Sequence, residues 1–454
     1  MMQIPGKREV ELIAEWLIEA ALKKGAVMAD VLYSAGSSAQ FSLRDGSPEK
    51  DTQGASFRIG CRVIDEQGRQ GVADMNSLSR DIPEKLIEAC MSNCSASEPE
   101  ADLYLFKGGS AEREGPPVFD PEAGRISHEE RERRCREMSD LAAAADKRVV
   151  SVRQSSWGDG FGETMYASSE NILRWYGDSF AACSVTVVME EGECLEMGGA
   201  SEESRRVRDV DHLFAAREAV ERTALTLGGK PEPTGRYDVV LDPEAAASLV
   251  ESAGELFLAS AVYKNRSLLK GRMGEKIGSG CLSLVDDGTL PWGIGSSPWD
   301  GEGVPTGRTV LMDRGMISSF LYDLKYARRF GTAPTGNASR SPGSLPGVGF
   351  TNMFILPGTR GIGDMLGDNS GGILVTELMG VHTIDPVSGD FSLGIKGALI
   401  GKDGSPVRPV AGMTIAGNLL GLLANISEVG RDLRFFGDIG GCPLVVKDVS
   451  MAGS

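Results

Sequence analysis

The fold is decided by residues 371–418, which read GGILVTELMG at 371–380, GDFSLGIKGALIGKDG at 389–404 and PVAGMTIAGN at 409–418. In each piece, β-branched and aliphatic residues form runs of strand length, and glycines separate the runs. Glycine tolerates the backbone conformations of tight turns, and the whole chain contains 59 glycines. The pattern predicts a sheet of short strands in the C-terminal half and argues against a helical bundle.

Length and composition limit the classes of protein that the chain can belong to. A chain of 454 residues, 41% hydrophobic and 24% charged, is long enough for two or three globular domains. A net charge of -17 opposes binding to a phosphate backbone, so we expect no direct nucleic-acid partner. The eight cysteines include no CxxC pair, which is typical of a reducing compartment.

Neither a leader nor a membrane segment is expected. The first residues, MMQIPGKREVELIAEW, carry charges where a signal peptide needs an apolar run. No apolar stretch approaches the roughly 18 residues of a membrane-spanning helix. These features predict a cytoplasmic protein.

The first half of the chain alternates helices with strands. Helical spacing of Val10, Ile13 and Leu17 predicts a helix over residues 7–24, and strand patterns follow over 29–74. A loop-rich linker covers 95–125. Ser127, with Glu130 three residues later, is a good start signal for a helix over 127–147.

Strands continue from about residue 149 to 199, and a helix follows over 210–227. We predict that Gly158–Gly162 forms a hairpin turn and that a second hairpin has its tip at Gly192. The glutamates around that tip are expected to be solvated: Glu190, Glu191, Glu193 and Glu196.

The best domain boundary is Gly228–Pro233, where two glycines and two prolines interrupt both helix and sheet. We therefore predict an N-terminal domain over 1–227 and a C-terminal domain over 231–454. A strand over 237–241 precedes a long helix, Pro243–Val262, with Asp242 as its N-cap. A further helix is predicted near 418–429.

The C-terminal signature segments resemble the TldD/PmbA family, also described as modulators of DNA gyrase. The matching elements are Ser297–Thr306 (SPWDGEGVPT), Thr376–Gly380, Gly389–Ser392 and Thr414–Asn418. The resemblance implies an α+β protein with N-terminal helices on a strand meander. It implies a C-terminal domain built on a large curved mixed or antiparallel sheet. Within the family the chain resembles the PmbA branch, also called TldE.

The resemblance also bears on the helix over 243–262. In the TldD branch the corresponding helix carries a His-Glu-x-x-x-His motif, whose imidazoles bind Zn²⁺ while the glutamate acts as general base. Here Val250, Glu251 and Glu255 occupy the three positions. We therefore expect a degenerate site with no catalytic residue and no metal in this chain, and zinc in a TldD-like partner.

An atypical ligand set is the alternative. Glu251 and Glu255 share a helix face, and Cys442 lies in the region where the family's peptidase branch has a cysteine ligand. Together they could form the site of an active metallopeptidase. Solvated glutamates and a buried thiol are the simpler interpretation. The chain has only three histidines, and none is within a helical turn of another: His128, His212 and His382.

The resemblance implies a peptide groove beside the family's zinc site, where an extended peptide can add to a sheet edge. The alternative is that these signature residues only form turns. Gly361–Gly367 is spaced differently from a dinucleotide loop and predicts a turn into a short helix. The candidate groove residues are Asp300, Glu302, Thr376, Glu377, His382, Asp390 and Ser392.

These features predict a subunit of a TldD/PmbA-type proteolytic complex that processes peptides. The expected partner is a TldD-like metallopeptidase subunit, or a second copy of this chain in a homodimer. A regulatory protein that binds gyrase or another protein without proteolysis is the alternative from a different functional class. No membrane partner is expected.

Overall fold

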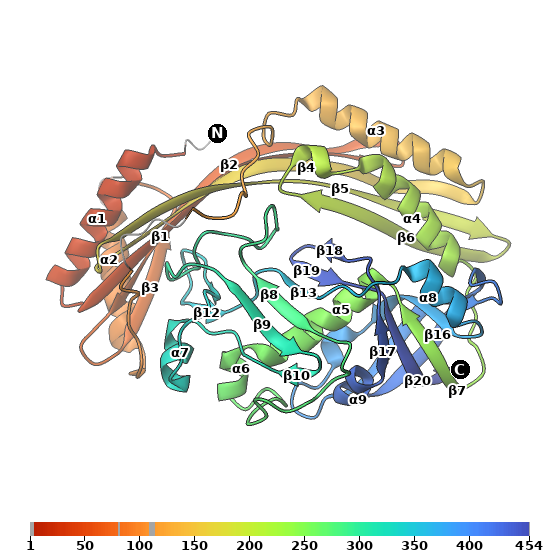
Figure 1. Cartoon of the computed structure of the whole chain (residues 1–454). Coiled ribbons are helices and arrows are strands. Elements are labelled where there is room, and N and C mark those ends of the chain that lie inside the picture. Colours follow the sequence, from red (N-terminus) through yellow and green to blue (C-terminus); the bar gives the residue numbers. More distant parts are fainter. Residues whose placement is uncertain (1–3, 80–81, 109–113, 454) are drawn as a thin grey trace.

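The computed structural model describes residues 4–79, 82–108 and 114–453 and shows an α+β protein, as predicted (Figure 1). A six-stranded antiparallel sheet with the order β3-β2-β1-β4-β5-β6 arches over the C-terminal half. β1, β2 and β3 confirm the strands predicted over 29–74, and β4, β5 and β6 extend the same sheet. The strands are β1 (Met28–Arg44), β2 (Ser47–Ile64), β3 (Gln70–Met75), β4 (Val149–Ser168), β5 (Ile172–Glu191) and β6 (Cys194–Ser204).

Helices cover one face of this arched sheet. Odd-numbered residues of β1, such as Val31 and Phe41, point into the cores beneath the helices, because side chains alternate along a strand. Even-numbered residues such as Leu32 face the C-terminal half, where Leu32 packs with Trp299. The helices are α1 (Lys7–Lys23), α2 (Ile82–Ala96), α3 (His128–Ala145) and α4 (His212–Thr226). Ser127 caps α3 as predicted, since its side chain accepts a hydrogen bond from the Glu130 amide.

The C-terminal half contains two further six-stranded sheets, β16-β15-β14-β7-β20-β17 and β10-β9-β8-β13-β19-β18. A β16–β20 pairing closes part of the first sheet on itself. The strands are β7 (Gly235–Leu241), β8 (Leu284–Asp287), β9 (Arg308–Asp313), β10 (Met316–Ile317), β13 (Met353–Ile355), β14 (Ile373–Met379), β15 (Asp390–Ile400), β16 (Pro406–Asn418), β17 (Ile426–Val429), β18 (Arg434–Phe436), β19 (Ile439–Gly441) and β20 (Leu444–Gly453). A small separate ladder pairs β11 (Ala338–Ser339) with β12 (Gly347–Val348).

Short helices join these strands. They are α5 (Pro243–Gly254), α6 (Ala259–Tyr263), α7 (Leu324–Phe330), α8 (Ile362–Asp368) and α9 (Leu419–Ala424). α8 confirms the predicted turn into a short helix after Gly361. No helix in the described part of the chain combines the length and apolarity that crossing a membrane requires.

The hairpin predicted at Gly158–Gly162 is wrong. These glycines lie inside β4, a continuous 20-residue strand, and β4 pairs with β5 across all of them. The turn between the two strands comes after Ser168 instead. The predicted hairpin tip at Gly192 is confirmed, and Gly192 has a φ of 63° there. Glycines inside a strand mark a bulge or a close approach by another backbone, which local sequence cannot separate from a turn.

Two predicted helices are too long. The helix over 243–262 ends at Gly254 and is followed by a 3-10 turn, Glu255–Phe257, before α6 begins. The chain leaves the helix there because Leu258 and Leu321 form an isolated bridge. The helix near 418–429 ends at Ala424, and Ile426 then pairs with Val446 of β20. In both cases tertiary strand pairing overrides local helix propensity.

Candidate functional site

α5 is held firmly at its N-terminal end. Asp242 caps its first turn by accepting a hydrogen bond from the Ala245 amide at 2.8 Å, and Arg222 of α4 binds the other oxygen at 2.7 Å. β19 lies so close beneath the first turn that a Cβ added to Gly441 would stand 1.9 Å from the Pro243 carbonyl oxygen. Packing therefore fixes the position of α5. The degenerate motif, Val250, Glu251 and Glu255, lies at the C-terminal end of this helix.

Val250, the residue that we expect at the position of the first histidine, points into the core. Its exposed fraction is 5%, and it lines an apolar cavity of about 20 Å³. A histidine ligand needs a metal on one ring nitrogen and a hydrogen-bond partner on the other. The remaining lining side chains offer neither: Leu249, Ala253, Phe257, Leu282, Leu284, Met312, Ile355, Leu423, Ile426 and Leu444.

Glu251 and Glu255 are exposed, and the end of α5 separates them. Glu251 lies on the last turn of α5, whereas Glu255 begins the 3-10 turn. Burial raises the pKa of the Asp438 carboxyl, and the nearby charges of Glu251 and Glu203 raise it further. The surroundings of Glu251 are therefore acidic.

Cys442 is fully buried, as the simpler interpretation predicted. Its Sγ donates to the Ile355 carbonyl at 3.6 Å, and burial raises the pKa of the thiol to about 12. A zinc ligand must be a thiolate, which this environment disfavours. Within residues 4–79, 82–108 and 114–453, no three His, Cys, Asp or Glu side chains are grouped so that they could hold a metal ion. The residues present do not fit a zinc site of the family's kind.

The three histidines lie on separate elements. His128 is near Asp51 at 3.4 Å, and His212 contacts Glu137 at 2.9 Å through Nε2. His382 is exposed in a 3-10 turn, Val381–Thr383, and this turn lies beside α5 because Ser252 donates to the Val381 carbonyl at 3.4 Å. His382 is therefore near the C-terminal end of α5 and is exposed.

The predicted groove residues fall into two separate groups. The first group lies on β14 and β15, which pair with each other. Thr376 is buried, and its carbonyl accepts a hydrogen bond from Arg222 at 2.7 Å. Glu377, Asp390 and Ser392 are exposed, and Asp390 accepts from the Asn418 side chain at 3.0 Å.

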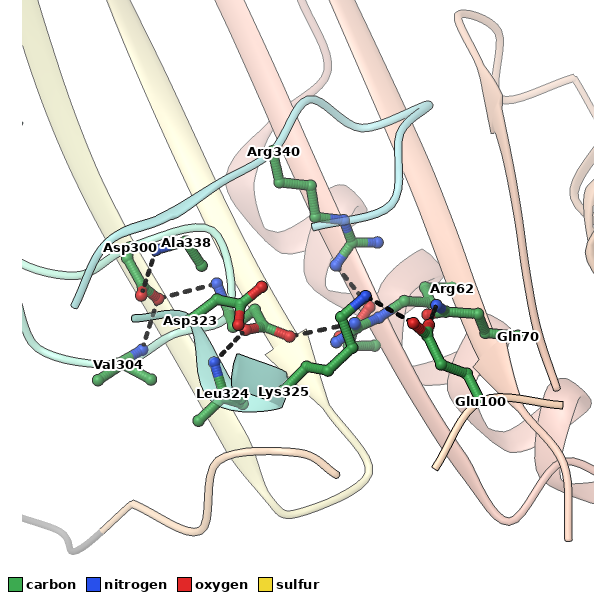
Figure 2. Close-up of polar contacts among 12 residues, drawn as sticks. Arg62, Gln70, Glu100, Asp300, Val304, Asp323, Leu324, Lys325, Ala338 and Arg340 are labelled. Carbon is green, nitrogen blue, oxygen red and sulfur yellow. Dashed lines mark hydrogen bonds and ion pairs between the residues drawn. The ribbon is translucent and has the colours of Figure 1, made fainter. Parts of the chain in front are cut away.

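Asp300 and Glu302 form the second group, which lies where the arched sheet meets the C-terminal half. Figure 2 labels Asp300, Arg62 and Arg340 at this place. Glu302 bonds Arg62 of β2 at 3.1 Å and accepts from the Leu324 amide at 3.0 Å. Arg62 also bonds Asp30 of β1 at 3.0 Å through Nε, and Arg340 reaches the other oxygen of Asp30 at 2.7 Å. The side chains of this junction cluster, Asp30, Arg62, Glu302 and Arg340, are at most 4% exposed.

Asp300 holds two loops beside the junction cluster. It accepts hydrogen bonds from the amides of Glu302 at 2.9 Å, Val304 at 3.0 Å and Ala338 at 2.9 Å. All these donors are backbone groups. Asp300 therefore has the turn-forming role that was the alternative to a peptide groove. Sequence spacing alone could not show that Glu302 bonds Arg62 of β2.

Asp300 also predicts a pH dependence of stability. Burial, and then the charge of Glu302, raises the pKa of its carboxyl from 3.8 to about 7. Between these values the folded protein keeps a proton that the unfolded chain has released, so the free energy of unfolding falls as pH rises. We expect Asp300→Asn to make this fall shallower, measured by denaturant titrations from about pH 4 to 7. If the free energy of unfolding changed equally with pH in the variant and the parent, Asp300 would not be the source of this pH dependence.

Family models match most of the chain. The PmbA/TldA metallopeptidase domain 1 matches residues 29–94, the central domain matches 121–227, and the C-terminal domain matches 234–453. Among curated relatives, a metalloprotease of Methanothermobacter thermautotrophicus is 27% identical over 89% of this chain and 88% of its own. Metalloprotease PmbA of Escherichia coli O157:H7 is 25% identical over 94% of this chain and 92% of its own.

Solved structures share the fold. A Thermotoga maritima protein described as a candidate modulator of a DNA gyrase matches with a TM-score of 0.89 and 26% identity, over 98% of this chain and 100% of its own. TldE from Thermococcus kodakarensis matches with a TM-score of 0.87 and 24% identity, over 97% of this chain and 100% of its own. The three domain matches and the whole-length relatives agree with the signature segments, and the chain belongs to the PmbA/TldD metallopeptidase family.

Proposed function

We propose that this chain is a PmbA/TldE-like subunit of a peptide-processing assembly and has no zinc site of its own. The observation that carries the proposal is Val250, a core residue in an apolar cavity at the position of the first zinc ligand. The other two positions support it, because Glu251 and Glu255 are exposed and Cys442 is a buried thiol. A chain that cannot hold the ion has no metal-activated water for peptide hydrolysis.

The partner in this proposal is a TldD-like chain with an intact His-Glu-x-x-x-His helix. Zinc bound there would supply the activated water, and this chain would supply binding surface and structural support. When no such partner is present, a homodimer is the expected form. The fold shared with a protein named TldE supports this assignment, and the family match supports a role beside a metallopeptidase.

Mixing experiments test the proposal. The purified chain alone should leave unstructured peptides intact, and adding a TldD-like protein from the same organism should produce chelator-sensitive cleavage. Co-purification should recover that TldD-like chain. Chelator-sensitive cleavage by this chain alone would instead favour the active metallopeptidase with an atypical ligand set. Recovery of gyrase without a TldD-like chain would favour the regulatory alternative.

A substitution at Glu251 distinguishes a zinc-free subunit from an active metallopeptidase with an atypical ligand set. We expect Glu251→Ala to leave the cleavage rate of the mixed assembly unchanged, since this exposed carboxylate activates no water. Loss of a catalytic base would lower the rate by about 100-fold or more. The matched control is the same change at the glutamate of the partner's His-Glu-x-x-x-His motif, which should abolish cleavage. A 100-fold loss with Glu251→Ala, by rate measurements under saturating partner, would exclude the zinc-free assignment.

A further inference from the structure

Two buried thiols from distant parts of the chain meet beneath α2. Cys61 lies on β2 and Cys90 lies on α2, and both are fully buried in the core that α1 and α2 cover. Cys90 Sγ donates to the Cys61 carbonyl oxygen at 3.1 Å. The two thiols are also hydrogen-bonded to each other. Cysteines that are 29 residues apart in sequence are therefore direct neighbours in the fold.

The surroundings of the two sulfurs give the thiols different acidities. The hydrogen bond between the side chains raises the pKa of Cys61 and lowers the pKa of Cys90. A hydrogen bond from the Ala73 backbone and the positive charge of Arg340 also lower the pKa of Cys90, against the effect of burial. Donors and cations near a sulfur favour the thiolate, which is the reactive form of cysteine. Cys90 is therefore the nucleophile of the pair, and Cys61 is the thiol beside it.

The other buried thiols of the described chain lack this combination. Cys94, one turn further along α2, donates to the Arg69 carbonyl at 3.2 Å, and burial raises its pKa. Burial raises the pKa of three more thiols to about 12, those of Cys135, Cys183 and Cys442. Thiols of this kind behave as inert apolar groups. Among the buried cysteines that the structure describes, Cys90 is the one whose pKa is lowered.

Close packing of α2 on β3 fixes the position of the pair. A Cβ added to Gly71 of β3 would lie 2.1 Å from the Cys90 carbonyl oxygen and 2.3 Å from the Cys94 amide nitrogen. Ala73, two residues further along β3, pairs with Cys61 of β2. The backbone of α2 therefore rests directly on the strand beside Cys61.

This geometry suits a disulfide between Cys61 and Cys90 and not one between Cys90 and Cys94. A disulfide has an S–S distance of about 2.05 Å and a Cβ–Cβ distance of about 3.5–4.5 Å. Two thiols that are already hydrogen-bonded reach that S–S distance by a shift of about 1–2 Å. Cysteines four residues apart on a helix keep their Cβ atoms about 5–6 Å apart. The helix would have to unwind to join Cys90 to Cys94.

We propose that Cys61 and Cys90 are a redox modification site, which hydrogen peroxide converts to a reversible disulfide. The Cys90 thiolate attacks one peroxide oxygen, the O–O bond breaks, and the other oxygen leaves as hydroxide, which takes up a proton to form water. The Cys61 sulfur then attacks the sulfur of the Cys90 sulfenic acid, forms the S–S bond and expels the second water. The two thiols lose two electrons, and the peroxide is reduced to two waters. A dithiol reductant restores both thiols by exchange.

The disulfide would act on the strand that carries the junction cluster. Gly60 and Arg62 flank Cys61 on β2 and face the opposite side of the sheet, because side chains alternate along a strand. Arg62 belongs to the junction cluster, and a Cβ added to Gly60 would lie 1.7 Å from the Pro342 carbonyl oxygen. The cross-link would therefore tie α2 to the part of β2 on which the C-terminal half rests. This role is independent of the proposed peptide-processing function.

Cross-link mapping of the full chain tests the proposal. The reduced chain is treated with hydrogen peroxide, the remaining thiols are alkylated in denaturant, and the product is digested with trypsin for mass spectrometry. We expect the loss of two alkylated thiols per chain, and a cross-link between the tryptic peptides 59–62 and 86–107 that dithiothreitol removes. The second peptide also contains Cys94. Cys94→Ser should therefore keep the cross-link, whereas Cys90→Ser should lose it.

Cys183→Ser is the matched control, since it removes a buried thiol from the separate core beneath α3 and α4. It should form the cross-link like the parent chain, and circular dichroism should show that all variants are folded. A peroxide-treated parent chain without the cross-link, or with the cross-link only in denaturant, would overturn the proposal whatever the variants do. So would a cross-link that persists in Cys90→Ser, or disulfides that instead join the exposed Cys194 or Cys281 of two chains.

Discussion

Replacing Arg62 with alanine should lower the free energy of unfolding by about 3–5 kcal/mol, the largest effect expected of any single substitution described for this protein. Arg62 is 2% exposed and bonds two carboxylates, Asp30 at 3.0 Å and Glu302 at 3.1 Å. Alanine removes the cation and leaves two buried negative charges with Arg340 as the remaining cation of the cluster. The change in denaturant midpoint, with the m-value held constant, measures the loss.

Arg58→Ala is the matched control. Arg58 lies on the same strand and the same face, and its side chain is 64% exposed where it pairs with Asp74 at 2.6 Å. An exposed pair of this kind contributes about 0–1 kcal/mol, so the control should unfold almost like the parent. A similar decrease in the free energy of unfolding for Arg62→Ala and Arg58→Ala would show that the junction cluster does not join the arched sheet to the C-terminal half.

Gly441→Ala should lower the free energy of unfolding by about 3 kcal/mol, because the added methyl group has no room. Its Cβ would lie 1.9 Å from the Pro243 carbonyl oxygen and 2.6 Å from the Ala247 amide nitrogen, and both are backbone atoms of α5. Either β19 or α5 must move, and α5 carries the degenerate motif. Thermal and denaturant unfolding of the purified variant measure the effect.

Gly363→Ala in α8 is the control for this substitution, since an added Cβ there meets nothing within 4 Å. In a helix this change should raise the free energy of unfolding by about 0.4–1 kcal/mol, because alanine reduces the conformational entropy of the unfolded chain. A Gly441→Ala variant as stable as this control would show that α5 and β19 are not packed as closely as described.

Local signals in the sequence predicted local structure well. Ser127 and Asp242 were identifiable as N-caps because the capping interaction lies within three residues. The Gly192 hairpin was recognisable for the same reason. The place of the glycines inside β4 was not recognisable, because pairing with β1 and β5 decides it. The end of α5 at Gly254 was not recognisable either, because the Leu258–Leu321 bridge decides it. These partners lie far away in sequence.

The candidate site was predictable to a different extent. Val250 and Glu255 at the ligand positions were visible in the sequence, but the apolar cavity around Val250 depends on strands such as β8 and β13. The junction cluster was hidden because Arg62 and Glu302 are 240 residues apart.

The metal content of the purified chain tests the central claim most directly. After expression in zinc-supplemented medium and gel filtration, inductively coupled plasma mass spectrometry should find zinc far below stoichiometric amounts, and the sample should not cleave peptides. Stoichiometric zinc that is lost with Glu251→Ala, together with peptide turnover by the chain alone, would contradict the assignment of a zinc-free subunit.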